Sequence, residues 1–205
     1  MNERPMTIRA VFFDYGGVIQ RTEFQSPRQK LAERFRLEYE DMDKIVFDSP
    51  TAKQATVGEI PAEKHWEAVA RRLKVGRDEI AEVEREFFAG DVVDHSIVKY
   101  LRSLRPRFKV GLISNAWSDM RDYLIRRKLD EIFDTLSISA EIGAAKPGAD
   151  IYLHALEQAQ VGAEAAVFVD DMPANIKACE MLGMKGILFN DPQEAMGRLK
   201  NLLGA

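Results

Sequence analysis

Residues 10–17 read Ala-Val-Phe-Phe-Asp-Tyr-Gly-Gly, an apolar run that ends at a carboxylate and two glycines. Four consecutive apolar residues predict a short strand buried on both faces, as in a parallel sheet. A carboxylate at the end of such a strand is costly to bury unless a ligand or partner uses it. The glycines allow a sharp turn and a close approach to a ligand. Asp14 therefore serves either a site or, as the simpler alternative, a turn that caps a helix.

Four more apolar runs predict strands, at residues 110–113, 135–138, 167–169 and 187–189. Segments with helical periodicity lie between them: 118–129, 149–160, and a helix marked by Ile176, Cys179 and Leu182. Strands that alternate with helices of this length imply βαβ units and a parallel sheet. We therefore predict an α/β fold with a doubly wound, Rossmann-like parallel sheet of five strands.

The region that follows the first strand has a different pattern. Residues from about 22 to 92 contain no convincing strand but several amphipathic helices. One begins at Ser26-Pro27, with serine as N-cap and proline at the first helical position, and others cover 61–73 and 77–88. An insertion here would lie over the carboxyl edge of the sheet, where open α/β proteins bind ligands. We predict a core of residues 1–20 and 93–205 and a helical cap of residues 21–92 that acts as a lid.

Composition excludes several classes of protein. The 205 residues are 46% hydrophobic and 30% charged, which is usual for a globular chain. A net charge of −4 without a basic cluster argues against nucleic acid as a partner. No apolar run approaches the roughly 20 residues that span a bilayer, and residues 1–5 lack a signal-peptide pattern. The single cysteine, Cys179, excludes an internal disulfide, so we expect a cytoplasmic location. The sequence does not indicate an oligomeric state.

Polar residues follow the second and third of these strands in positions that suit a phosphate site. Ser114 and Asn115 end the strand at 110–113, and a hydroxyl with backbone N–H groups can hold a phosphate oxygen there. Lys146 precedes a proline that biases it to an extended conformation, and an inward lysine would neutralise a transferring phosphoryl group. Taken singly, Ser114 also fits a helix cap, and Lys146 fits a solvated surface.

The fourth strand ends in the acidic pair Asp170-Asp171. Adjacent carboxylates repel unless a cation lies between them, and Mg²⁺ favours one or two carboxylates together with substrate phosphate. One helix cap and one surface acid are the alternative for this pair alone. Because the carboxyl ends of parallel strands meet at one edge, we expect Asp14, Ser114, Lys146 and the acidic pair to converge there. This conjunction predicts a phosphate and Mg²⁺ site.

These motifs, in this order and across the whole chain, resemble those of the haloacid dehalogenase superfamily of hydrolases. The segments Leu-Ile-Ser114-Asn115-Ala-Trp and Phe-Val-Asp170-Asp171-Met-Pro-Ala-Asn175 are most similar to bacterial glucose-1-phosphate phosphatases and to the N-terminal phosphatase domain of soluble epoxide hydrolase. The resemblance implies a Mg²⁺-dependent phosphatase for a small phosphorylated metabolite, with a sugar phosphate favoured.

The resemblance also implies roles for individual residues. Asp14 would be the nucleophile, forming an aspartyl-phosphate, and also a Mg²⁺ ligand. Further metal ligands would be the backbone carbonyl of Gly16 and the carboxylate of Asp171, with Asp170 either a second carboxylate ligand or an outer-shell partner. Substrate contacts would come from Ser114 and Asn115, which hold the phosphate, and from Lys146, which bridges it to Asp14.

One departure from the family pattern concerns the general acid and base. Phosphatases of this superfamily usually carry a second aspartate two residues after the nucleophile, where this chain has Gly16. Losing such a group typically lowers rates by 10²–10⁴-fold. We therefore expect either a substrate with a good leaving group, such as an anomeric hydroxyl, or a proton supplied by a cap residue or by a group of the substrate. Two alternatives remain: a metal-free 2-haloacid dehalogenase using Asp14, which the acidic pair argues against, and a phosphometabolite-binding relative without catalysis.

Overall fold

The computed structural model describes residues 7–204; residues 1–5, considered above for a signal peptide, lie outside this range. Five strands form one parallel sheet in the order β5-β4-β1-β6-β7. From β1 the chain builds outward through β4 and β5, and then crosses to β6 and β7 on the other side. This confirms the predicted fold. The strands are β1 (Ala10–Phe13), β4 (Lys109–Ser114), β5 (Thr135–Ile138), β6 (Ala166–Asp170) and β7 (Lys185–Leu188).

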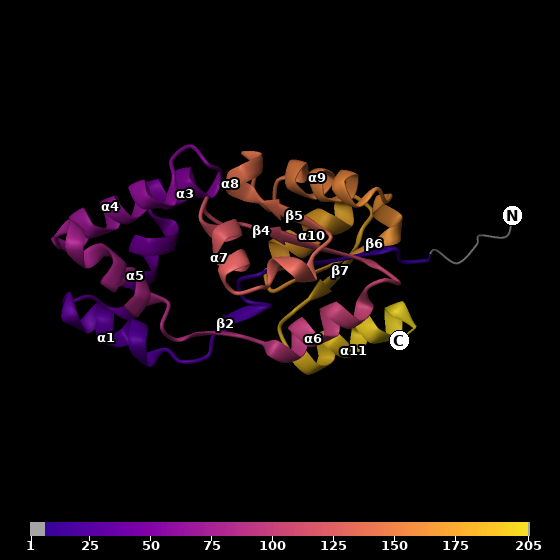
Figure 1. The fold of residues 1–205 in the computed structure, drawn as a ribbon, viewed down its shortest axis with the longest axis horizontal. Helices are drawn as coiled ribbons and strands as arrows, with labels where there is room; N and C mark the ends of the chain where they lie inside the picture. Colours follow the sequence, from indigo (N-terminus) through magenta and orange to yellow (C-terminus); the bar gives the residue numbers. More distant parts are fainter. Residues whose placement is uncertain (1–6, 205) are drawn as a thin grey trace, which may run out of the picture.

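Helices cover both faces of the sheet, which is why the strands are continuously apolar. Along β1, Val11 and Phe13 belong to one hydrophobic cluster, and Ala10 and Phe12 belong to the other. The first cluster includes side chains of α6 (His95–Leu104) and α11 (Pro192–Leu203), and the second those of α9 (Ala149–Ala159) and α10 (Pro173–Met181). Figure 1 shows α6 and α11 on one side of the sheet and α9 on the other. All four β1 residues are buried.

Most differences from the predicted boundaries are small. β6 continues through Asp170, so this carboxylate belongs to the buried strand itself. β7 begins and ends earlier than the predicted 187–189, and α7 (Met120–Arg126) is shorter than the predicted 118–129. A brief helix, α8 (Ser139–Ile142), follows β5. No helix within residues 7–204 is both long and apolar enough to cross a membrane.

Between β1 and α6 the chain forms a helical group with a hydrophobic cluster of its own, built around Leu31, Met42, Trp66 and Phe87. Figure 1 shows α1, α4 and α5 gathered at one end of the sheet. Ser26 is the first helical residue of α1 and not its N-cap, and the predicted helix at 77–88 divides into a 3₁₀ turn and α5. The members are α1 (Ser26–Arg34), α2 (Tyr39–Asp43), the π-helical turn η1 (Lys44–Asp48), α3 (Pro50–Thr56), α4 (Ala62–Leu73) and α5 (Ile80–Phe87).

A two-stranded antiparallel sheet joins this helical group to the rest of the molecule. Its strands lie at the two ends of the region that was expected to lack strands, and residues 23–90 contain only helices and turns. β2 (Gln20–Thr22) pairs with β3 (Asp91–Val93), where the chain leaves and returns. An ion pair of 2.9 Å between Arg21 and Asp94 closes the same junction. Strands of three residues are too short to show a periodicity, so the sequence alone does not reveal this pairing.

Candidate active site

Three carboxylates meet at the carboxyl edge of the sheet. β1 and β6 are neighbours with Phe13 opposite Val169, so the next residues, Asp14 and Asp170, lie side by side. The Asp14 N–H donates to the Val169 carbonyl at 2.9 Å, which continues this pairing. Oxygen atoms of Asp14, Asp170 and Asp171 all lie within 4.8 Å of one another. The structure thus brings together residues that the sequence separates widely, as predicted.

Lys146 lies within the same cluster. Its ammonium nitrogen is 2.8 Å from Asp14 Oδ2 and 2.7 Å from Asp170 Oδ2, and its side chain is 1% exposed. One lysine compensates only one of three carboxylates, which leaves an excess of negative charge in a buried place. Such an arrangement is unfavourable without a further cation. The all-oxygen donor set fits a hard divalent cation such as Mg²⁺.

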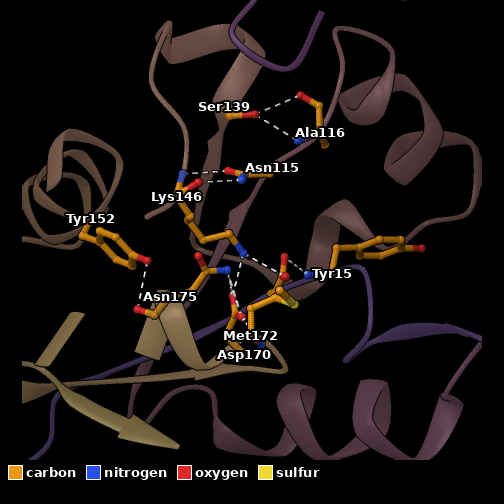
Figure 2. A network of polar contacts seen from close by, with 10 residues as sticks. Tyr15, Asn115, Ala116, Ser139, Lys146, Tyr152, Asp170, Met172 and Asn175 are labelled. Atoms are coloured by element: carbon orange, nitrogen blue, oxygen red, sulfur yellow. Dashed lines mark hydrogen bonds and ion pairs between the residues drawn. The ribbon is translucent and has the colours of Figure 1, made fainter. Parts of the chain in front are cut away.

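Asp170 is the most completely bonded of the three carboxylates. Its Oδ1 accepts hydrogen bonds from the Met172 N–H at 2.7 Å and from Asn175 Nδ2 at 3.0 Å, while Oδ2 accepts from Lys146. Figure 2 shows Asn175 and Lys146 converging on Asp170. Within residues 7–204, the Asp171 carboxylate accepts no hydrogen bond from another side chain, and the residue is partly exposed. The geometry therefore suits Asp170 to holding Lys146 in place and leaves Asp171 freer to bind an ion.

Burial and the closeness of these charges shift the pKa values of the carboxylates. Burial raises the pKa of Asp14 to about 6, although the adjacent Lys146 opposes the shift. Burial and the negative charge of Asp170 also raise the pKa of Asp171. Both shifts mean that the folded protein disfavours the ionised carboxylates when no cation other than Lys146 is nearby.

The Asn115 side chain contacts the backbone of Lys146. Its side-chain amide donates to the Lys146 carbonyl at 2.9 Å and accepts from the Lys146 N–H at 2.8 Å, as Figure 2 shows. Ser139 holds the next residue, Ala116, through bonds of 3.0 and 3.1 Å to its N–H and carbonyl. Ser114 ends β4 with 3% exposure. The Asn115 side chain thus positions Lys146, and Ser114 remains available to a ligand.

The two glycines after Asp14 differ in what they require. Gly17 has a φ of +76°, and a Cβ there would lie 2.2 Å from Asp171 Oδ2, so only glycine lets Asp171 approach. A Cβ at Gly16 would meet no atom within 4 Å. Space therefore does not explain why Gly16 replaces the aspartate expected of a general acid.

A family model described as haloacid dehalogenase-like hydrolase matches residues 8–183, a span that contains every residue of this site. The chain belongs to the haloacid dehalogenase-like hydrolase family. A sesquiterpene phosphatase of Aspergillus oryzae is 26% identical over 202 residues, covering 97% of this chain and 98% of the relative. Rat bifunctional epoxide hydrolase 2 is 28% identical over 131 residues, which are 61% of this chain but only 24% of that protein.

Solved structures of the haloacid dehalogenase-like hydrolases share this fold. A family enzyme from Bacteroides thetaiotaomicron, in complex with magnesium and inorganic phosphate, has a TM-score of 0.75 at 18% identity, with 88% of this chain and 93% of that chain covered. A dehalogenase has a TM-score of 0.70 at 16% identity, with 97% and 98% covered. Likeness of fold therefore does not distinguish a phosphatase from a dehalogenase.

In this haloacid dehalogenase-like hydrolase, a cavity of about 1210 Å³ opens beside the cluster. Gly16, Ser114 and Lys146 line it on the sheet side, and residues of the inserted helical group, including Phe47 and Phe88, line it on the other. The sheet edge and the inserted helices thus enclose one space. His65, Trp66 and Cys179 are buried.

Two residues of the site were not assigned roles from the sequence. Asn175 binds Asp170, and its carbonyl accepts the Tyr152 hydroxyl at 3.0 Å. Trp117 lines the cavity and packs on the helical group. Each is the last residue of a segment that carries the family resemblance, which is the only local signal for either.

Proposed function

We propose that this chain hydrolyses phosphate monoesters in the presence of Mg²⁺, with Asp14 as the nucleophile. The observation that carries the proposal is the buried cluster of Asp14, Asp170 and Asp171 around the ammonium group of Lys146. A nucleophilic carboxylate, a fixed positive charge and an incompletely neutralised cation site are the parts that phosphoryl transfer needs.

Mg²⁺ fits the donor chemistry of this cluster. We assign the carboxylates of Asp14 and Asp171 and the backbone carbonyl of Gly16 as its ligands. Asp170 acts from the outer shell, because Lys146, Asn175 and Met172 already bond its oxygens. When bound, Mg²⁺ supplies positive charge that offsets the crowded carboxylates and the substrate phosphate.

The side chains then perform two displacements. A carboxylate oxygen of Asp14 attacks phosphorus and the bond to the ester oxygen breaks, so the leaving group departs as an alkoxide or phenolate and takes a proton from water. Water then attacks phosphorus of the aspartyl-phosphate, which releases inorganic phosphate and restores Asp14. Ser114 and Lys146 hold the phosphate oxygens through both steps, and Asn115 keeps Lys146 in position. Because Gly16 supplies no acid, good leaving groups react fastest.

We also propose that the inserted helices act as a cap, with boundaries near residues 21 and 92. The chain enters and leaves this group through the paired strands β2 and β3, so the two connections are adjacent. Helical residues line the cavity opposite Lys146. The cap would therefore shield the reacting phosphate from bulk water and contact the organic part of the substrate.

Two classes of compound are candidates for the alcohol part of the substrate. The sequence favours a sugar phosphate, which stays a prediction. The sesquiterpene phosphatase among the relatives suggests a terpenoid phosphate. In either case we expect a small phosphorylated molecule, and the acidic net charge of −4 argues against nucleic acid as the partner.

Turnover of phenyl phosphate with and without Mg²⁺ tests the proposal. We expect activity that EDTA abolishes and Mg²⁺ restores, and a loss of at least 10³-fold in kcat for Asp14→Asn. Asp150→Asn is the matched control, because Asp150 is exposed and lies outside the cavity. Halide release from 2-haloacids in EDTA would instead support the dehalogenase, and saturable phosphate binding without turnover would support a binding protein.

A further inference from the structure

One side of the cavity is built from aromatic rings. Phe47 of η1, Phe88 directly after α5 and Trp117 of the loop after β4 all line it, and we call these three residues the aromatic wall. We propose that the aromatic wall binds an apolar organic group of the substrate, so that the enzyme favours phosphate esters of hydrophobic alcohols or phenols over sugar phosphates. This inference rests on the proposed phosphatase function and narrows its substrate class.

Phe47 is the strongest single observation. Its side chain is 49% exposed although it belongs to a cavity wall, so half of a large apolar ring has no protein covering it. It lies in a π-helical turn, an uncommon geometry that is frequent at functional sites. Contact with an apolar ligand would remove this surface from water, which is favourable in proportion to the area covered.

The position of Phe47 is held by its aromatic neighbours. Its ring centroid lies 5.3 Å from that of Phe87, 6.1 Å from Phe88 and 6.1 Å from Trp117. Trp117 in turn lies 4.5 Å from the His65 ring in α4. The rings of the aromatic wall therefore pack against one another as a preformed surface. Binding a ligand to this surface costs little side-chain conformational entropy.

The aromatic wall is continuous with the phosphate end of the cavity. Trp117 follows Ser114 by three residues in one loop, and Ser114, Lys146 and the aromatic wall line the same space. A phosphate held at Ser114 and Lys146 would therefore direct its organic group along this wall. The cavity of about 1210 Å³ exceeds the roughly 300–1,000 Å³ of usual small-molecule pockets. It has room for a substrate larger than a small sugar phosphate.

Several polar side chains of the cavity bond to each other. The side-chain oxygen of Gln20 accepts hydrogen bonds from the hydroxyl groups of both Tyr15 and Tyr123. Thr22 donates to Asp91 at 2.8 Å. Sugars are recognised by many free donors and acceptors, and these groups are already paired.

Arg28, which also lines the cavity, pairs with Asp43 at 2.9 Å and with Asp91 at 3.2 Å. Other lining side chains are unpaired among residues 7–204: the carboxylates of Glu84 and Asp119 and the guanidinium groups of Arg85 and Arg127 form no ion pair and no hydrogen bond to another side chain. Burial raises the pKa of both carboxylates. A hydroxylated substrate would bind to these four groups, so the test must include a hydroxylated probe.

A series of 4-alkylphenyl phosphates provides the test, with phenyl, 4-ethylphenyl and 4-butylphenyl phosphate as probes. Their phenol leaving groups are nearly equivalent and need no general acid, so differences report binding of the alkyl chain. We expect kcat/KM to rise by up to about fourfold per buried methylene, and roughly 10- to 100-fold across the series. A 4-butylphenyl phosphate with two hydroxyls on the chain should lose most of this gain.

Phe47→Ala locates the effect on the aromatic wall. We expect it to lower the ratio of kcat/KM for 4-butylphenyl over phenyl phosphate by fivefold or more. Phe24→Ala is the matched control: Phe24 is 62% exposed and lies outside the cavity, so its variant should keep the wild-type ratio. If Phe47→Ala fails to fold, the series on the unchanged protein still decides the question.

The outcomes separate this inference from the proposed function. Mg²⁺-dependent turnover with no rise along the series, or with equal preference for the hydroxylated chain, overturns the hydrophobic substrate class and leaves the phosphatase intact. Equal loss of the ratio in Phe47→Ala and Phe24→Ala overturns the role of the aromatic wall. Absence of turnover with every phosphate overturns the proposed function and this inference together.

Discussion

Lys146 and Asp170 form a buried ion pair of 2.7 Å, in which the Asp170 side chain is 0% exposed and the Lys146 side chain 1%. A buried charge is tolerated only with partners for each of its oxygens, and Met172 and Asn175 supply the remaining ones. Because Asp170 is committed in this way, the adjacent acids of the pair have different tasks. We propose that Asp170 positions the lysine and that Asp171 binds the metal.

Matched asparagine variants at these two positions should separate the tasks. Asp170→Asn is expected to lower kcat by about 10–100-fold with little change in the Mg²⁺ concentration for half-maximal rate, because Lys146 loses its charged partner. Asp171→Asn is expected to raise that Mg²⁺ concentration by about 10–100-fold. Mg²⁺ titrations of initial rates measure both. An equal rise in the Mg²⁺ requirement for the two variants would show that Asp170 binds the ion directly.

The neighbouring glycines offer a second pair of variants with opposite outcomes. Gly17→Ala introduces a Cβ that would lie 2.2 Å from Asp171 Oδ2 at a φ of +76°. We expect it to weaken Mg²⁺ activation and to reduce the free energy of unfolding by about 1–3 kcal/mol.

Gly16→Asp meets no obstruction, because no atom lies within 4 Å of a Cβ at this position. Since the new carboxyl can protonate the leaving group, the rate for an alkyl phosphate relative to an aryl phosphate should rise about tenfold or more. Gly16→Ala gives the baseline for a side chain without an acid. A ratio in Gly16→Asp no higher than in Gly16→Ala would mean that lack of an acid is not what limits alkyl esters.

Asn115 is expected to act on catalysis through Lys146. Asn115→Ala removes hydrogen bonds of 2.9 and 2.8 Å to the Lys146 backbone, so the ammonium group loses its fixed position. We expect kcat for phenyl phosphate to fall about tenfold or more, with a smaller change in KM. Asn115→Asp keeps the acceptor for the Lys146 N–H, so its kcat should lie between those of the wild type and Asn115→Ala. Asn201→Ala is the control, because Asn201 is an exposed residue of α11. A change confined to KM in Asn115→Ala would instead indicate that Asn115 contacts the substrate directly.

Stability of the junction between the helical group and the core should depend on pH through Asp94. Burial alone would raise the pKa of Asp94, but hydrogen bonds from Ser96, Arg21 and the Ile97 N–H lower it to about 2. Because the folded-state pKa is below the unfolded value of about 3.9, the stabilisation is present above that value. It is lost as pH falls toward 2.

Asp94→Asn retains an N-cap for α6 but loses the charge that pairs with Arg21, so it isolates the ionic part. At pH 7 we expect this variant to be less stable than wild type by about 1 kcal/mol, and Asp94→Ala by about 2 kcal/mol. Urea unfolding at pH 7, 5 and 3.5 measures the differences. The gap between wild type and Asp94→Asn should narrow at pH 3.5, and a constant gap would contradict the ionic explanation.

Several features follow from the sequence because their causes are local. The strand at Ala10–Phe13 is apolar on both faces, which requires helices above and below the sheet, and they are present. Motif order placed Asp14, Lys146 and the acidic pair at one sheet edge, because parallel strands end together. The amphipathic helix predicted at 61–73 is present as α4.

Other features were decided by tertiary structure alone. The sequence carries an amide at Asn115, but only the folded chain shows that this amide binds the Lys146 backbone. The short strands β2 and β3, the grip of Asn175 on Asp170 and the aromatic wall also join residues distant in sequence or from separate elements. Burial of one face of a helix or strand depends on the spacing of apolar residues along the chain, so it can be predicted from the sequence. Contacts between polar groups or rings from distant parts of the chain form only when the chain folds, so no local sequence pattern predicts them.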